Sequence, residues 1–427
     1  MASPAPGKAA HRSLRLKPAA VWAFLVAGAL GASSAPALEL TRSELSGLVQ
    51  LSAVHADPLR SFINSGTGVV RYDDSGVQLQ QSVLRLETDF GNAFSSDIVA
   101  NYYQDGDLHL GLTQAALLWK PVSAGKLRTR ARAGFFYPRM SAENVDLGWL
   151  SPYTYTQSAI NSWIGEELRV LGVEGSVYSP GRSRRSPWSW ELTGAIYGGN
   201  DPFGTIISWR GFATHDRQSL HHDRLQFAPY PPVIDEITFQ GPAWVEPFHE
   251  IDNRLGGYAG FHLRYRNQLD LRLYRYDNNA NPKAVNQQQL YAWDTRFNSI
   301  ALRYDPAPGT RVLAQWMGGS SDMGEHLVGI GFDSFYLMLS QRLGEHRVSL
   351  RYDFWDVDES DLYARDANSS EGDALTAAWR WNLDKQWQLG FEYHLNVNSA
   401  ENRVSVGEAI DARQQQALVV LEYRFGK

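Results

Sequence analysis

The sequence predicts an all-β fold: a transmembrane, antiparallel, up-and-down β-barrel of about sixteen strands, with long extracellular loops and short periplasmic turns. Three observations predict it. Segments of alternating apolar and polar residues recur to the end of the chain, the connections between them alternate in length, and a secretory signal precedes them. Successive side chains of a strand point to opposite faces, so this alternation is typical of a wall between lipid and water.

The alternation is clearest in the segment 127–137. Arg128, Arg130 and Arg132 occupy one face of it, and Leu, Thr, Ala, Phe and Tyr residues occupy the other. Sixteen segments of this kind are expected. They span 45–54, 77–89, 94–104, 109–119, 127–137, 168–178, 188–198, 257–266, 268–276, 296–304, 310–317, 332–341, 346–355, 373–382, 387–396 and 414–425.

The connections between these segments point to a membrane barrel. Tight turns rich in Gly, Pro, Asn and Asp fall at 90–93, 267, 305–309, 342–345 and 383–386. The alternate connections are longer, apart from 105–107, and span 55–76, 138–167, 199–256, 277–295, 356–372 and 397–413. Short turns at one end and long loops at the other indicate a periplasmic and an outer face. The even strand count then puts both termini on the periplasmic side.

Residues 1–37 are interpreted as a cleaved signal peptide, and residues 38–427 as a single outer-membrane barrel domain. A basic start without acids leads into an apolar run over 19–32, and Ala35 and Ala37 fit a cleavage site. Cleavage leaves 36 Lys and Arg against 46 Asp and Glu, a net charge of −10, which argues against a nucleic-acid partner. The chain has no Cys, which excludes a disulfide framework and thiolate chemistry.

The aromatic residues separate a membrane barrel from a soluble β-sandwich. The chain has 14 Trp, 20 Tyr and 18 Phe, which a sandwich with an aromatic core would also explain. Lipid-facing aromatic residues nevertheless cluster at the short-turn ends of strands, as in the girdle of a membrane barrel. These residues are Trp119, Trp188, Tyr265, Tyr304, Trp381, Trp387 and Phe425, and an opposite girdle is expected at Tyr137, Tyr352 and Phe354.

These features predict the outer membrane of a Gram-negative bacterium, with membrane lipid and lipopolysaccharide around the barrel. The last strand ends in Tyr423 and Phe425. This ending resembles the C-terminal signal that the barrel-assembly machinery reads, so that machinery is expected as a partner during biogenesis.

The inward face is expected to line a water-filled pore. Basic groups outnumber acidic ones at the inward positions, although the chain is acidic overall. Fixed guanidinium charge along a narrow aqueous path raises the local anion concentration, which predicts a preference for anions. The alternative is that Arg and Glu pair across neighbouring strands and only brace the wall. The pore-lining candidates are Arg128, Arg130, Arg132, Arg264, Arg272, Arg347, Arg351, Glu174 and Glu392.

Residues 134–144 resemble a segment of the phosphate-selective porin O and P family, in which a strand ends in Gly-x-Phe-x-x-Pro and runs into a short acidic helix or loop. Gly134, Phe135 or Phe136, Pro138 and Glu143 fill this pattern. The resemblance implies a sixteen-stranded channel whose inward-folded loops narrow the bore. The loop 138–167 is the candidate constriction, and the alternative is an extracellular cap packed by its own aromatic residues. Its candidate residues are Pro138, Glu143, Asn144, Asp146 and Trp163.

The loop 199–256 is too long for a simple connector, and it either folds into the barrel or caps it. It contains His215, His221, His222 and His249, whose spacing fits no metal motif. Exposed polar histidines are therefore expected, with no metal and no cofactor. The acidic residues of 356–372 are interpreted as a solvated rim.

The leading interpretation is a porin for passive diffusion of small hydrophilic solutes, compatible with a homo-oligomer. A structural or adhesive barrel with a loop-plugged lumen is the alternative. An outer-membrane lipid hydrolase is less favoured, because no Gly-x-Ser-x-Gly motif and no lipid-facing His-Ser pair is present. We therefore expect no enzymatic activity.

Overall fold

The computed structural model describes residues 40–234, 241–324, 327–361, 363 and 366–426. The expected signal peptide, residues 1–37, lies outside these residues. Among the described residues, no helix is both long and apolar enough to cross a bilayer.

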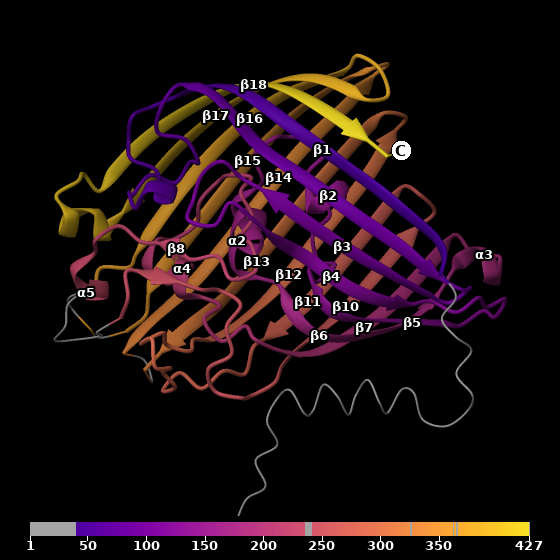
Figure 1. The fold of residues 1–427 in the computed structure, drawn as a ribbon, viewed down its shortest axis with the longest axis horizontal. Coiled ribbons are helices and arrows are strands. Elements are labelled where there is room, and N and C mark those ends of the chain that lie inside the picture. The colour runs from indigo at the N-terminus through magenta and orange to yellow at the C-terminus, as the bar shows by residue number, and fades with distance from the viewer. Residues whose placement is uncertain (1–39, 235–240, 325–326, 362, 364–365, 427) are drawn as a thin grey trace, which may run out of the picture. The chain divides into compact units, whose positions relative to one another are not determined.

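The described chain folds into a closed barrel of sixteen antiparallel strands (Figure 1). Strand β18 pairs with β1 through a register that runs from Gly47 opposite Phe425 to Ala56 opposite Gln416, and this pairing closes the barrel. The barrel strands are β1 (Leu40–Ala56), β2 (Gly76–Phe90), β3 (Phe94–Tyr102), β4 (Leu110–Trp119), β5 (Arg128–Phe136), β6 (Val170–Ser179), β7 (Trp188–Gly198), β10 (Gly256–Tyr265), β11 (Leu269–Asp277), β12 (Asp294–Ala307), β13 (Thr310–Met323), β14 (Val328–Leu343), β15 (His346–Glu359), β16 (Ser370–Asn382), β17 (Trp387–Ala400) and β18 (Asp411–Phe425).

Short elements occupy the connections. A separate two-stranded sheet pairs β8 (Leu225–Gln226) with β9 (Trp244–Val245). The helices are α2 (Ala159–Glu167), α3 (Gly181–Arg184), α4 (Thr205–Trp209) and α5 (Pro231–Ile234), and the 3-10 turns are η1 (Phe62–Asn64), η2 (Leu147–Trp149) and η3 (Glu401–Val406). Figure 1 shows α3 at the opposite end of the barrel from α5 and β8.

The predicted sixteen strands and the alternation of loop lengths are confirmed. Residues 308–309 join β12 to β13, and residues 344–345 join β14 to β15. Gly309 and Gly344 have φ of +81° and +62°, a conformation that favours glycine in such tight turns. At the other end the connections include the long loops 57–75, 137–169 and 199–255.

Strands β12 to β17 are longer than the alternation predicted. Strand β13 was expected to end at residue 317, but it continues to Met323 and pairs with Val328 of β14. Its added part begins with Gly318, Gly319, Ser320 and Ser321. Small residues give no apolar alternation, so the sequence carries no signal for this part of the strand.

Tyr137 does not join the outer aromatic girdle, contrary to the prediction. Gly134 has φ of +130°, which interrupts the regular pleat just before β5 ends at Phe136. Phe136 and Tyr137 are then both buried. The ring of Tyr137 stacks on Trp149 of the following loop at a centroid distance of 4.1 Å.

The outer face of the barrel carries an apolar belt. Its exposed side chains include Leu84, Leu117, Leu192, Ile300, Leu337, Leu350, Leu375 and Val419. At the short-turn ends, Trp119, Trp188, Tyr304, Trp381 and Trp387 expose between 36% and 44% of their surface. Apolar surface of this extent is unfavourable in water and matches the hydrocarbon region and aromatic girdle of a membrane.

The long loops fold into the lumen and pack there. The inner faces of β10 to β15 and the loops share one apolar cluster, whose aromatic members include Tyr258, Tyr276, Phe297, Phe332, Trp355, Trp163, Phe203 and Phe212. The ring of Trp163 stacks on Phe203 at 4.7 Å and meets Phe332 edge-on at 5.0 Å. Burial of these rings stabilises the loops against the wall.

Candidate solute channel and its constriction

The loop 137–169 enters the barrel, and its helix α2 lies against the inner wall. Helix α2 contacts β13, β14 and β15, and all of its residues are buried. Ser158 caps the helix, because its hydroxyl accepts a hydrogen bond from the backbone N–H of Asn161 at 3.3 Å. The loop predicted to form the constriction therefore lies inside the barrel.

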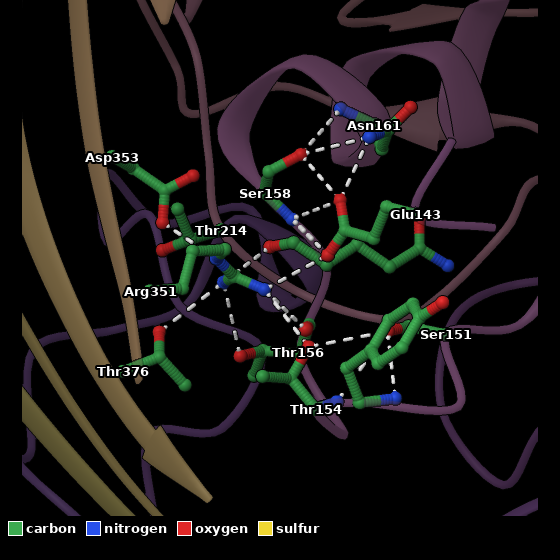
Figure 2. Close-up of polar contacts among 12 residues, drawn as sticks. Glu143, Ser151, Thr154, Thr156, Ser158, Asn161, Thr214, Arg351, Asp353 and Thr376 are labelled. Carbon is green, nitrogen blue, oxygen red and sulfur yellow. Dashed lines mark hydrogen bonds and ion pairs between the residues drawn. The ribbon is translucent and has the colours of Figure 1, made fainter. Parts of the chain in front are cut away.

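Arg351 of β15 attaches this loop to the wall (Figure 2). Its fully buried guanidinium forms ion pairs with Glu143 at 3.0 Å and Asp353 at 2.7 Å. It also donates to the backbone carbonyls of Thr156 and Gln157 at 2.7 and 2.8 Å. A guanidinium presents its donors in a rigid planar arrangement, so these bonds fix the position of the loop.

Glu143 joins the start of the loop to the first turn of α2. Its carboxylate accepts from the Ser158 hydroxyl at 2.6 Å and from the Asn161 amide at 2.7 Å, as Figure 2 shows. The carboxylate is fully buried, so its charge depends on Arg351 and on these donors. Loop, helix cap and wall thus form one hydrogen-bonded unit.

Strand β17 provides a second set of attachments. Glu392 accepts from the backbone N–H groups of Tyr155 and Thr156 at 2.6 and 2.8 Å. His394 shares a hydrogen bond of 2.8 Å with Thr214 of the loop 199–255. Both long loops are therefore bound to the same side of the barrel.

The two loops are also bound to each other through buried acids of α2. Glu166 pairs with Arg210 at 2.6 Å and lies 3.3 Å from His215. Burial opposes ionisation of Glu166, but the charges of Arg210 and His215 lower its pKa to about 2. Its neighbour Glu167 has no such cation, and burial raises its pKa to about 8 although Trp163 donates to it.

The arginine row of β5 is largely neutralised. Arg130 bonds to Glu191 at 2.6 Å, and Arg132 pairs with Glu174 at 2.9 Å. Arg139, which the sequence did not single out, contacts Glu174 at 2.8 Å and Glu191 at 3.1 Å. These pairs brace the wall and leave little free charge for solute.

Two neighbouring pore-lining candidates, Arg264 and Arg272, share a carboxylate in the same way, whereas Arg128 bonds only to neutral groups in the described chain. Arg264 lies 3.4 Å from Asp270, and Arg272 pairs with Asp270 at 2.9 Å. Arg128 lies near the periplasmic end of β5 and donates to Ser183 at 3.3 Å. Along β5, β10 and β11, most of the arginines expected to face solute are therefore paired with carboxylates of the wall.

The remaining candidates are divided between packing and an open cavity. Pro138 and Trp163 are buried, and Glu143 is held by the ion pair with Arg351 described above. Asn144 donates to the carbonyl of Trp149 at 3.0 Å. Asp146 forms an ion pair with Arg424 of β18 at 2.7 Å. Asn144 and Asp146 both line a cavity beneath the loop.

Two cavities open beneath the loop on the periplasmic side, with volumes of about 520 and 590 Å³. Both are lined by Asp146, Lys385 and Arg424. The second is also lined by Arg347 and Arg380 and by the carboxylates Glu345 and Asp384. We call the space bounded by these seven residues the periplasmic vestibule. Among the outer loops of the described chain, two small cavities measure about 20 and 40 Å³.

Three arginines lie side by side at the periplasmic ends of β14, β15 and β16, and two of them, Arg347 and Arg380, line the vestibule. Arg347 is directly opposite Arg342 in the β14–β15 pairing and directly opposite Arg380 in the β15–β16 pairing. Like charges in directly opposed positions are destabilising. Within the described chain none of the three forms an ion pair with a carboxylate; Arg347 bonds to Ser340 at 2.8 Å and Arg380 to the carbonyl of Ser151 at 3.2 Å.

Loop tyrosines cover these arginines. Arg347 lies over the ring of Tyr153 at 5.3 Å and Arg380 over the ring of Tyr155 at 4.1 Å. The sequence indicated Arg347 but missed Arg342, because the predicted strand ends at residue 341, two residues before β14 ends at Leu343. It gave no signal for the two tyrosines, since loop residues carry no strand alternation.

Acidic and histidine clusters lie elsewhere in the loops. Carboxylate oxygens within 4.8 Å of one another could hold a metal ion in two groups, Asp201 with Glu250 and Asp252, and Glu359 with Asp361 and Asp366. The expectation of exposed histidines is wrong for His215, which is buried beside Glu166. His222 lies 2.8 Å and His249 3.8 Å from Glu246. The absence of a bound metal stays a prediction.

No family model and no curated protein matches the sequence. Solved outer-membrane proteins share the fold. The outer membrane channel DcaP of Acinetobacter baumannii is 11% identical with a TM-score of 0.54, over 90% of this chain and 97% of its own. OmpF of Salmonella typhi, in complex with daunomycin, is 10% identical with a TM-score of 0.53, over 91% and 100%.

OmpT, an outer membrane protein of Vibrio cholerae in a trimer form, is 7% identical with a TM-score of 0.52, over 90% of this chain and 99% of its own. At these identities the likeness shows the fold. The chain has the closed-barrel fold of these outer-membrane proteins. Its exposed apolar belt agrees with a place in a membrane.

Proposed function

We propose that this barrel is a porin, a channel for passive diffusion of small hydrophilic solutes that prefers anions. The observation that carries the proposal is the periplasmic vestibule, whose lining includes Arg347 and Arg380, two arginines without a carboxylate partner in the described chain. The resemblance of residues 134–144 to the phosphate-selective porin O and P family supports a loop-narrowed channel.

A wall built only for stability would place opposite charges across from one another. The β5–β7 side of the barrel follows that rule, for example in the pair of Arg132 and Glu174. Arg342, Arg347 and Arg380 break it. Arg380 is only 4% exposed, and a buried cation without a counter-ion is costly. An anion in the vestibule would supply the missing countercharge and would be concentrated there.

The inward loops determine when solute passes. Residues 144–149 line the vestibule, and most residues of the segment 143–163 are buried. Their attachments to Arg351 and Glu392 are polar. We infer that passage requires these loops to loosen, so the channel is narrow and its conductance depends on loop position.

A structural or adhesive barrel is the second candidate. The apolar cluster that joins the loops to the inner wall favours it, because such a core stabilises a filled lumen. A lipid hydrolase remains disfavoured on the sequence, and the absence of enzymatic activity stays a prediction. A homo-oligomer, lipopolysaccharide contacts and delivery by the barrel-assembly machinery also remain expectations.

Swelling of proteoliposomes tests the proposal. Wild-type protein should admit a small organic monoanion faster than an organic cation of similar size. The variant R347Q/R380Q should lose this preference. The control variant R254Q/R275Q removes the same charge from exposed positions outside the vestibule and should keep it. Equal rates for the two solutes in the wild type would contradict the anion preference, and absence of swelling would favour the structural candidate.

A further inference from the structure

Three neighbouring periplasmic turns carry many cations and no acids. Residues 120–127 join β4 to β5, residues 180–187 join β6 to β7, and residues 266–268 join β10 to β11. None of these turns contains Asp or Glu. Their cations, which we call the basic rim, are Lys120, Lys126, Arg182, Arg184, Arg185 and Arg266.

The three turns contact one another, so their cations belong to one surface. The Ser179 hydroxyl donates to the carbonyl of Lys126 at 2.7 Å, and this bond joins the first turn to the end of β6, where the second turn begins. The backbone N–H of Arg266 donates to the carbonyl of Pro187 at 2.7 Å, which joins the second turn to the third. In Figure 1, α3 of the second turn marks this end of the barrel.

The cations of the basic rim are available to a ligand. Lys120, Lys126, Arg182, Arg185 and Arg266 are exposed. Within the described chain none of the six cations forms an ion pair. Of the other periplasmic turns, 91–93 and 308–309 carry no charged residue, 344–345 contains a Glu, and 383–386 contains one Asp and one Lys. The basic rim is therefore a group of cations without acids in one sector of this end, separate from the arginines of the vestibule.

Apolar side chains adjoin the basic rim on its membrane side. Val122 is 86% exposed, Leu127 58% and Trp188 41%. The ring of Trp188 packs on Tyr265 at a centroid distance of 4.8 Å, within the periplasmic aromatic girdle. Aromatic and basic residues at this level of a membrane protein lie where lipid headgroups begin.

We propose that the basic rim binds the phosphate groups of anionic phospholipids in the periplasmic leaflet of the outer membrane. Guanidinium groups bind phosphate through paired, charge-assisted hydrogen bonds. Each cation close to an anionic membrane surface strengthens association by about fivefold at low screening. Exposed apolar and aromatic groups beside the cations favour a lipid over an acidic soluble protein. This binding is independent of whether the barrel conducts solutes.

Quenching of Trp188 fluorescence by brominated lipids tests the proposal. The protein is reconstituted into vesicles that contain equal amounts of phosphatidylglycerol and phosphatidylcholine, and only one of the two lipids carries brominated chains. The signal of Trp188 is the difference between the wild type and the variant W188F. Brominated phosphatidylglycerol should quench Trp188 several-fold more than brominated phosphatidylcholine, and added salt should reduce the difference.

Variants locate the binding. R182Q/R184Q/R185Q should abolish the difference between the two lipids, whereas R182K/R184K/R185K should keep most of it. The matched control R254Q/R275Q/R413Q removes three exposed cations at the outer end and should keep the full difference. Equal quenching by both lipids in the wild type would overturn the proposal, as would an unchanged preference in the triple Gln variant or a lost preference in the control. If the Gln variant does not fold, the salt dependence of the wild type still tests the proposal.

Discussion

Replacing Arg351 with Met should release the loop 137–169 from the wall. The substitution removes seven hydrogen bonds. It leaves the fully buried carboxylates of Glu143 and Asp353 without their cation. Removal of one partner from a buried ion pair costs about 3–5 kcal/mol. We expect the free energy of unfolding to fall by about this amount and the single-channel conductance to rise as the loop moves.

Denaturant unfolding in lipid or detergent measures the first effect, and planar-bilayer recording measures the second. The control is Arg296→Met, because Arg296 pairs with Asp277 and Asp294 but its side chain is 46% exposed. Half-exposed pairs contribute at most about 1 kcal/mol. The double variant R351M/E143Q should lose less stability than the two single losses combined. If R351M behaves like R296M in both assays, the attachment does not hold the loop.

Three further outcomes are expected. Burial raises the pKa of Glu167 from 4.5 to about 8. Between these two pH values the unfolded chain has lost the proton and the folded chain keeps it, so the free energy of unfolding should fall as pH rises. A plot of the unfolding midpoint against pH should show this fall in the wild type and a weaker one in E167Q. Leu375→Arg, near the middle of β16, should cost about 2–4 kcal/mol of unfolding free energy, whereas Ala131→Arg, beside the periplasmic girdle, should cost about 1 kcal/mol or less. A single Cys at Ser405 should react with an impermeant label on intact cells, and one at Pro308 should not; reversed labelling would invert the topology.

The wall could be predicted from sequence because lipid and the polar interior impose a period of two. In β5 the arginines at 128, 130 and 132 alternate with small and apolar residues, so both faces are evident. The same rule fails where a strand meets a folded loop. Tyr276, Phe297 and Phe332 are apolar on the inner face, and only a partner inside the lumen explains them.

The strand pattern of the sequence does not predict which loop side chains fill the lumen. Trp163, Phe203 and Phe212 come from two loops far apart in sequence, and nothing local indicates that their rings meet. The alternation predicts the inward positions of Arg130 and Arg351 but not their partners. Partner choice depends on cross-strand register and on the path of loop 137–169, which tertiary packing determines.

The most direct test of the channel is planar-bilayer recording of the purified wild-type protein in a salt gradient. The account predicts stepwise conductance increases on insertion, with a reversal potential whose sign shows that anions cross more easily than cations. The R347Q/R380Q variant should move that potential toward zero. Folded protein that inserts without any conductance step would contradict the channel and would identify a barrel whose lumen the loops fill permanently.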